Sequence, residues 1–170
     1  MAGPLILVIG GAASGKSEFA ETLVCGLGET RLYLATAEAG DDEMAAKIAT
    51  HAARRGAGWR VVEAPLDPAP ALRGPHPVLF DCATMWLTNH LMAGSDLELA
   101  REALLEALTA SPAPVAVVTN EVGQGIVPAD ALTRRFREAQ GRLNIALAAR
   151  ADCVVQVVAG LPNVLKGQLP

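Results

Sequence analysis

The segment Gly10–Ser17 has the residue types and spacing of a phosphate-binding loop. It reads GGAASGKS, fits G-x-x-x-x-G-K-S, and stands between an apolar run and a helical pattern, the context that the motif requires. Its glycines let backbone N–H groups turn toward phosphate oxygens, so a turn that binds nothing is the weaker interpretation. We expect a nucleoside triphosphate here, with Lys16 on the β- and γ-phosphates and the Ser17 hydroxyl on Mg²⁺. The residues expected to contact the nucleotide are Gly10, Gly11, Ala12, Ala13, Ser14, Gly15, Lys16 and Ser17.

Polar residues close four further apolar runs: Thr36, Glu63, Asp81 and the segment 119–121. Ligands of an open α/β sheet bind beyond the carboxyl ends of the strands, so these residues should share the edge that carries the phosphate-binding loop. Asp81, which follows PVLF, is the best candidate for the acid that holds Mg²⁺ directly or through water. The alternative is an N-cap of the next helix. Ordinary solvation of a strand end explains Glu63 and Glu121 equally well.

One histidine stands within the helical pattern DDEMAAKIATHAARR. His51 continues a stripe begun by Met44 and Ile48, and this spacing alone favours a half-buried structural histidine. Arg54 and Arg55 flank it on the same side of a helix and could hold a nucleotide phosphate against its imidazole. The spacing alone leaves both interpretations open.

The elements that must position these residues are short apolar runs alternating with helical patterns. Strands are expected at 5–10, 31–36, 59–64, 77–81, 114–121 and 152–158. The runs are continuous rather than alternating, so both faces of the sheet should be covered by helices. Together with the loop after the first strand, they predict an α/β fold of the P-loop NTPase (RecA-like) type, with a mostly parallel sheet in a single domain, 1–170.

Two helices are the clearest in the sequence, at 130–150 and at 97–108. The first should begin at an Asp130 N-cap. Its apolar stripe consists of Leu132, Phe136, Ala139, Leu143 and Leu147. Its arginines, which a solvated face explains better than a phosphate site, are Arg134, Arg135, Arg137 and Arg142. The stretch 65–77, rich in proline and glycine, should be a loop.

Composition excludes several classes of protein. The chain has 170 residues, 51% hydrophobic and 19% charged, which suits one folded domain and argues against disorder. A net charge of -4 leaves no basic field for a nucleic-acid partner. The three scattered cysteines favour reduced thiols. The N-terminus does not resemble a signal peptide, and no apolar stretch approaches the roughly 18 to 20 residues of a membrane span, so we expect a cytoplasmic protein.

Several motifs together resemble one family, the bifunctional adenosylcobinamide kinase / adenosylcobinamide-phosphate guanylyltransferase of cobalamin biosynthesis. They are GGAASGKS at 10–17, YLAT after the second strand, DDEMAAKIATH at 41–51, W-R at 59–60 and TNEVGQGIVP at 119–128. The resemblance extends into the helix that contains RFREAQGRLN, so it covers nearly the whole chain. The phosphate-binding loop is shared by very many proteins, whereas the DDEMA and TNEVG motifs in this order are specific.

The resemblance implies two reactions: phosphoryl transfer from ATP or GTP to adenosylcobinamide, then GMP transfer from GTP to the resulting phosphate through a guanylyl-histidine. The family's nucleophile falls on His51, which reverses the preference given by spacing. Further nucleotide contacts implied by the family fall on Ala35, Thr36, Ala37, Ala52, Ala53, Arg54, Arg55, Glu63 and Asp81. The resemblance also implies a homotrimer. Two positions depart from the family pattern: Ala13 stands where arginine is common, and Asp81 where glutamate is common.

Two other functions compete with this interpretation. A GTP-dependent switch protein would need N-K-x-D and D-x-x-G motifs, and the sequence has neither, its lysines being only Lys16, Lys47 and Lys166. A small-molecule kinase without guanylyl transfer is the nearer alternative, and it would leave His51 structural. The sequence does not reveal the preferred phosphoryl donor or the residues that contact the corrinoid.

Overall fold

The computed structural model describes residues 1–38, 42, 45–46, 49–50, 53 and 55–170. In this part of the chain, all six apolar runs form parallel strands of one sheet. These strands are β1 (Leu5–Gly10), β2 (Arg31–Ala35), β3 (Trp59–Glu63), β4 (Val78–Asp81), β5 (Val115–Asn120) and β6 (Cys153–Val158). A seventh strand, β7 (Leu161–Lys166), pairs antiparallel with β6. The order across the sheet is β3-β2-β4-β5-β1-β6-β7.

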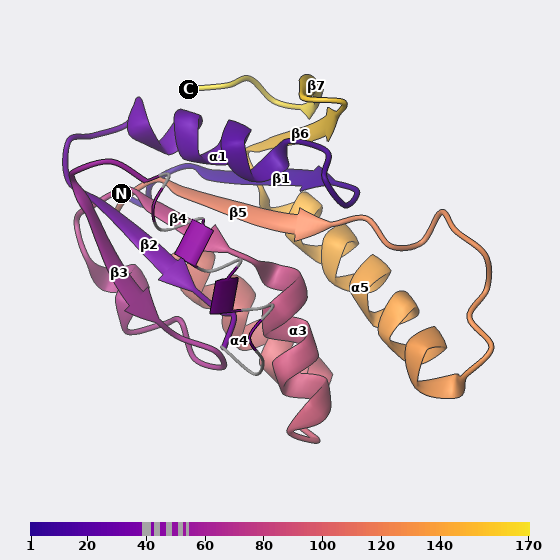
Figure 1. Cartoon of the computed structure of the whole chain (residues 1–170). Helices are drawn as coiled ribbons and strands as arrows, with labels where there is room; N and C mark the ends of the chain where they lie inside the picture. Colours follow the sequence, from indigo (N-terminus) through magenta and orange to yellow (C-terminus); the bar gives the residue numbers. More distant parts are fainter. Residues whose placement is uncertain (39–41, 43–44, 47–48, 51–52, 54) are drawn as a thin grey trace.

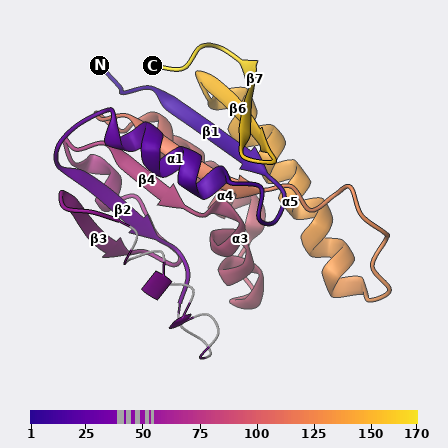
Figure 2. The same cartoon turned by 45° about the horizontal axis from the view of Figure 1, so that its top comes forward.

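Helices cover both faces of this sheet, as Figures 1 and 2 show from two directions. They are α1 (Lys16–Cys25), α3 (Ala83–Met92), α4 (Leu97–Thr109) and α5 (Ala131–Arg150), with a 3-10 helix η1 (Ala71–Arg73) in the loop before β4. Helix α1 packs on one face, and α3, α4 and α5 pack on the other. The α/β fold of P-loop type with a mostly parallel sheet is therefore confirmed.

Strand β1 shows why its apolar run does not alternate with polar residues. Leu5 and Leu7 face the core under α3, α4 and α5, whereas Ile6 and Val8 face the core under α1. All four are almost completely buried. Because successive strand side chains point to opposite faces, a strand covered on both sides needs apolar residues at every position.

The edges of the sheet depart from the sequence expectations. Among the described strands β3 pairs with β2 alone, at the edge of the sheet, and its Val61 and Val62 are exposed, so burial on both faces does not hold there. β7 lies outside the six expected runs; its sequence LPNVLK contains a proline, which sheets tolerate at an edge strand. It follows a two-residue turn, Ala159 and Gly160, in which both residues have positive φ. That backbone conformation is typical of tight hairpins.

The helix ends largely confirm the sequence pattern. Asp130 caps α5 by accepting a hydrogen bond from the Thr133 N–H at 2.7 Å. Leu132, however, is exposed, so the buried stripe of α5 begins after its first turn. The cysteines are free, as expected. Among the described residues, no helix is long and apolar enough to cross a membrane.

Candidate functional site

At two positions of the loop between β1 and α1, the backbone conformation or the close packing requires glycine. Gly15 adopts φ 89° as it caps α1. A Cβ on Gly10 would lie 2.4 Å from Ser14 Oγ and 2.7 Å from the Val157 carbonyl oxygen. The Lys16 ammonium donates a hydrogen bond to the Gly11 carbonyl at 3.0 Å, which holds it over the loop. The strand-loop-helix context expected of the phosphate-binding motif is thus present.

Neighbouring strands fix the position of this loop. The Gly160 N–H, in the β6–β7 turn, donates to the Ser14 carbonyl at 2.8 Å. The Glu121 N–H, just after β5, donates to the Gly10 carbonyl at 3.0 Å. The loop is therefore held by backbone hydrogen bonds from the ends of both strands that flank β1.

The loop residues fit a magnesium-bound nucleotide. Ser14 Oγ is buried without a hydrogen-bond partner among the described residues, as expected of a group that awaits a ligand oxygen. Lys16 and Ser17 are half-buried, so a positive charge and a hydroxyl remain within reach of a phosphate. The described residues contain no cluster of three or more histidine, cysteine or acidic side chains that would form a metal site. Mg²⁺ needs no such cluster where phosphates supply its other ligands.

Asp81 ends β4 and lies beside a buried tyrosine. The Tyr33 hydroxyl donates a hydrogen bond to Asp81 Oδ2 at 2.8 Å. Burial raises the pKa of Tyr33 far above its usual value, and the Asp81 charge and this hydrogen bond add to the shift. The N-cap of α3 is Cys82, whose Sγ accepts from the Met85 N–H. The capping interpretation of Asp81 is therefore wrong.

The electrostatics of Cys82 connect Asp81 with the phosphate-binding loop. Burial raises the pKa of the Cys82 thiol to about 11, and the negative charge of Asp81 contributes to the increase. The positive charge of Lys16 acts in the opposite sense on the same thiol. Lys16, at the start of α1, and Asp81, at the end of β4, thus have opposite effects on one buried thiol.

Arg55 lies on the other side of Tyr33. Its guanidinium carbon stands 3.4 Å from the centroid of the Tyr33 ring. Its Nη1 is buried and has no hydrogen-bond partner among the described residues. Ala53 is exposed. The predicted nucleophile His51 lies outside the described residues, as do Ala52 and Arg54.

The other described residues implied by the family lie near the ends of β2 and β3. Thr36 is fully buried, and its hydroxyl both donates to the Cys82 carbonyl and accepts from the Cys82 N–H, each at 2.8 Å. It therefore ties β2 to β4 and has no free hydroxyl hydrogen. Ala35 and Ala37, on either side, are half-buried.

Two acids considered in the sequence have different surroundings. Glu63 is exposed at the end of β3, and β2 separates that strand from β4. The Glu121 carboxylate accepts a hydrogen bond from the Gly123 N–H, while its own N–H holds the phosphate-binding loop. Glu121 therefore shapes the backbone after β5, and its carboxylate is already engaged.

A buried polar network beneath the site was not anticipated. Asn144 Oδ1 accepts hydrogen bonds from the Thr119 hydroxyl at 2.7 Å and from Gln140 Nε2 at 2.8 Å. Asn144 Nδ2 donates to the Asn120 carbonyl at 3.0 Å. Gln140 and Asn144 stand four residues apart on the buried side of α5 with Leu143, and polar residues on an apolar face were the signal that could have revealed them.

Two arginines of α5 do more than solvate a helix face. Arg137 donates to the carbonyls of Gly123 and Gly125, and Arg134 donates to those of Pro128 and Ala129. They hold the loop that follows β5, which Figure 1 shows extending away from the sheet before it enters α5. Arg134 is exposed and Arg137 is half-buried, so both side chains lie at the surface as expected, and their hydrogen bonds to the loop are an additional role.

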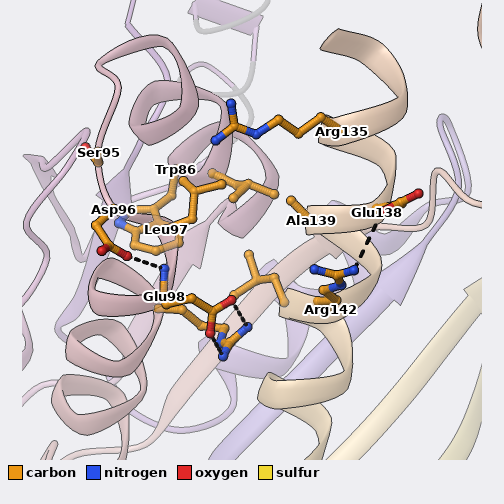
Figure 3. Close-up of a pocket in the computed structure, with 12 residues that line it drawn as sticks. Trp86, Ser95, Asp96, Leu97, Glu98, Arg135, Glu138, Ala139 and Arg142 are labelled. Carbon is orange, nitrogen blue, oxygen red and sulfur yellow. Dashed lines mark hydrogen bonds and ion pairs between the residues drawn. The ribbon is translucent and has the colours of Figure 1, made fainter. Parts of the chain in front are cut away.

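A cavity of about 380 Å³ lies between α3, α4 and α5, away from the phosphate-binding loop. Figure 3 shows its charged lining. Arg142 lies 3.7 Å from Glu138, and Arg101 pairs with Glu98. Because two of its arginines already have acidic partners, we do not assign this cavity to the nucleotide site.

Comparisons with known proteins connect this geometry with one family. A family model described as "Cobinamide kinase / cobinamide phosphate guanyltransferase" matches residues 6–165. The bifunctional adenosylcobalamin biosynthesis protein CobP of Pseudomonas aeruginosa is 46% identical over 168 residues, which cover 95% of this chain and 97% of that protein. The corresponding CobU of Salmonella typhimurium is 43% identical over 182 residues, covering 92% of this chain and 97% of that one.

Structural similarity extends further than sequence similarity. A solved structure of a protein from Pyrococcus horikoshii OT3 superposes with a TM-score of 0.56 at 9% identity, covering 98% of this chain and 87% of that one. At this identity the similarity supports the fold alone.

Proposed function

The chain belongs to the cobinamide kinase / cobinamide phosphate guanyltransferase family, and we propose that one nucleotide site at its phosphate-binding loop serves both reactions. It is a bifunctional enzyme of adenosylcobalamin biosynthesis. The single observation that carries the proposed site is the loop Gly10–Ser17, held between β5 and the β6–β7 turn with Lys16 over it. Asp81 supplies a carboxylate at the same sheet edge.

In the kinase step, the hydroxyl oxygen of adenosylcobinamide attacks the γ-phosphorus of ATP or GTP. The bond from the γ-phosphorus to the β–γ bridging oxygen breaks, the nucleoside diphosphate leaves, and the hydroxyl proton passes to solvent. Lys16 and the loop N–H groups stabilise the charge that develops on the phosphate oxygens. Ser17 and Asp81 are the residues proposed to hold Mg²⁺, which neutralises phosphate charge when bound.

In the guanylyl step, a neutral imidazole nitrogen of His51 attacks the α-phosphorus of GTP and pyrophosphate leaves. A phosphate oxygen of adenosylcobinamide phosphate then attacks the same phosphorus. The P–N bond breaks, adenosylcobinamide-GDP forms and the histidine is regenerated. The support for His51 is its place in the DDEMAAKIATH motif. Arg55, with one guanidinium nitrogen lacking a partner among the described residues, is proposed to bind a phosphate of the same nucleotide.

Labelling with GTP carrying radioactive α-phosphorus tests this assignment. The wild-type protein should retain acid-labile, base-stable label after denaturation, because a P–N bond has formed. His51→Ala should lose this label and guanylyl transfer, assayed with supplied adenosylcobinamide phosphate, and should keep most kinase activity. His76→Ala, in the loop before β4, is the matched control and should keep both. Label retained by His51→Ala would remove His51 from the mechanism, and a wild type that is never labelled would favour the plain kinase.

Three further properties belong to the proposal. ATP or GTP is the phosphoryl donor, the enzyme is a homotrimer, and it works in the cytoplasm. The family resemblance supports the first two, and the free cysteines suit a reducing compartment. Sedimentation analysis measures the oligomeric state directly.

A further inference from the structure

Tyr33 is the only tyrosine of the chain, and it lies buried near the end of β2. Its ring packs in the core under α1, in an edge-to-face arrangement with Trp59 at a centroid separation of 6.3 Å. Packing alone would be satisfied by phenylalanine. A buried hydroxyl also needs a hydrogen-bond partner, so what it contacts shows what the tyrosine adds.

That partner is the carboxylate proposed to bind the metal. The hydroxyl donates to Asp81 Oδ2 at 2.8 Å, which is a normal length for a hydrogen bond from a hydroxyl group. A carboxylate accepts several hydrogen bonds or metal contacts through two oxygens. The bond from the Tyr33 hydroxyl to Oδ2 therefore restricts the rotation of the Asp81 carboxylate.

A positively charged side chain, that of Arg55, lies over the face of the same ring. The Arg55 guanidinium carbon stands 3.4 Å from the ring centroid, within the range of a cation–π contact. Tyr33 therefore contacts a carboxylate through its hydroxyl and a guanidinium through its ring. Core packing alone does not require either of these contacts with a charged side chain.

We propose that Tyr33 is a positioning residue of the nucleotide site: its hydroxyl orients the Asp81 carboxylate for the metal, and its ring holds Arg55 toward the phosphates. The inference rests on the function proposed above. Groups that orient a ligating carboxylate typically change metal affinity or activity by about 10- to 100-fold when removed. Tyr33→Phe removes the oxygen and keeps the ring, so it isolates the first role.

The test measures binding of a non-hydrolysable GTP analogue by calorimetry over a range of Mg²⁺ concentrations. Tyr33→Phe should raise the Mg²⁺ concentration needed for tight binding by about 10-fold or more and leave metal-free binding nearly unchanged. Thr109→Val is the matched control, since it also removes one internally bonded hydroxyl, on α4 away from the site, and it should behave as wild type. Thermal melts of each variant verify that the protein is folded.

A double-mutant cycle separates an effect through Asp81 from a general loss of packing. Asp81→Asn weakens metal-dependent binding by itself, and adding Tyr33→Phe to it should cause little further loss. Tyrosine labelled with ¹³C on the ring carbon that bears the hydroxyl gives a single NMR signal, because the chain has one tyrosine. That signal should move in Asp81→Asn without any nucleotide present.

The outcomes distinguish this inference from the proposed function. Unchanged Mg²⁺ dependence in Tyr33→Phe, an equal effect in Thr109→Val, or full additivity with Asp81→Asn would each overturn the role of Tyr33. A wild type that binds Mg²⁺-nucleotide but transfers neither group would refute the proposed reactions and leave the positioning role standing. The ring's hold on Arg55 is tested by Arg55→Lys, which should weaken analogue binding at saturating Mg²⁺. Unchanged affinity there would refute that part.

Discussion

At the scale of single residues, Lys16 is the group whose removal has the clearest consequence. Its ammonium is half-buried over the loop, held by the Gly11 carbonyl. Both reactions place negative charge on phosphate oxygens, so one lysine should serve both. We expect Lys16→Ala to lower the rate of each reaction by about 100- to 1,000-fold, the usual effect of losing one such electrostatic contact.

The measurement assays both reactions on one preparation, with Lys166→Ala as the control. Lys166 donates hydrogen bonds to the Ala148 and Ala149 carbonyls at the end of α5. The control substitution therefore removes an ammonium group from another part of the same fold. Near-normal guanylyl transfer in Lys16→Ala would mean that the two reactions use different phosphate sites.

The sequence revealed residues whose role is local and missed those whose partners are distant. Lys16 and Ser17 could be predicted because the motif contains both the loop and the start of its helix. Tyr33 could not, because its hydroxyl meets a carboxylate 48 positions away. Thr36 was expected at the site, but its bonds to Cys82, 46 positions away, make it a link between strands. The surface position of Arg134 and Arg137 could be predicted, whereas the carbonyls that they hold could not, because those carbonyls belong to an irregular loop.

At the scale of elements, the phosphate-binding loop depends on its fit against β6. A methyl group on Gly10 would stand 2.7 Å from the Val157 carbonyl oxygen, a backbone atom that cannot turn away. Gly10→Ala should therefore cost roughly 1–3 kcal/mol of unfolding free energy and weaken nucleotide binding. Gly11→Ala is the matched control, since nothing lies within 4 Å of its added Cβ. Denaturant unfolding and binding of a GTP analogue are measured for both variants. Equal losses of unfolding free energy and affinity in Gly10→Ala and Gly11→Ala would show that the close packing of Gly10 against β6 is not required.

The junction between α5 and β5 depends on Asn144. Asn144→Leu would remove the acceptor of Thr119 and Gln140 and the donor to the Asn120 carbonyl. Each buried polar group left without a partner costs roughly 1–3 kcal/mol. Because the residue after Asn120 holds the loop at Gly10, nucleotide affinity should fall as well. Ile145→Ala, exposed on the same helix, should change unfolding free energy by less than about 0.5 kcal/mol. If Asn144→Leu and Ile145→Ala lower the free energy of unfolding equally, the polar network has no special role in stability.

The sequence predicted interior elements better than edge elements. Strands buried on both faces, such as β1, have a continuous apolar run that the sequence shows directly. β3 has a similar run, WRVVE, although its side chains are largely exposed, so the run alone does not distinguish an edge from the centre. β7 has no such run, because it forms by hairpin pairing through backbone bonds with β6.

At the scale of the whole molecule, the strand order assembles the site. β5 lies between β1, which carries the phosphate-binding loop, and β4, which carries Asp81. β2 brings Tyr33 to the other side of β4. Groups carried by β1, β2 and β4 thus lie toward one edge of the sheet, and the two cores that sandwich the sheet keep that edge in place. Loss of the cores should therefore abolish the site and the fold together.

The buried ionisable groups of these cores should make the free energy of unfolding depend on pH in the alkaline range. Burial raises the pKa of Cys82 to about 11 and raises the pKa of Tyr33 and Cys153, so the unfolded chain releases these protons at lower pH than the native protein. The unfolded state then binds fewer protons, and the free energy of unfolding falls as pH rises. This stabilisation is complete below the thiol pKa of an unfolded chain, near 8.5, and is lost progressively above it.

Cys82 alone should account for a loss on the order of 3 kcal/mol by the time the pH reaches its folded pKa of about 11. Denaturant unfolding of the metal-free protein from neutral to alkaline pH measures the slope. Cys82→Ala should flatten the curve, whatever it costs at neutral pH, because only the change with pH is compared. Cys25→Ala removes an exposed thiol and should leave the slope unchanged. If both variants lose stability with the same slope as wild type, the buried thiol does not couple folding to pH.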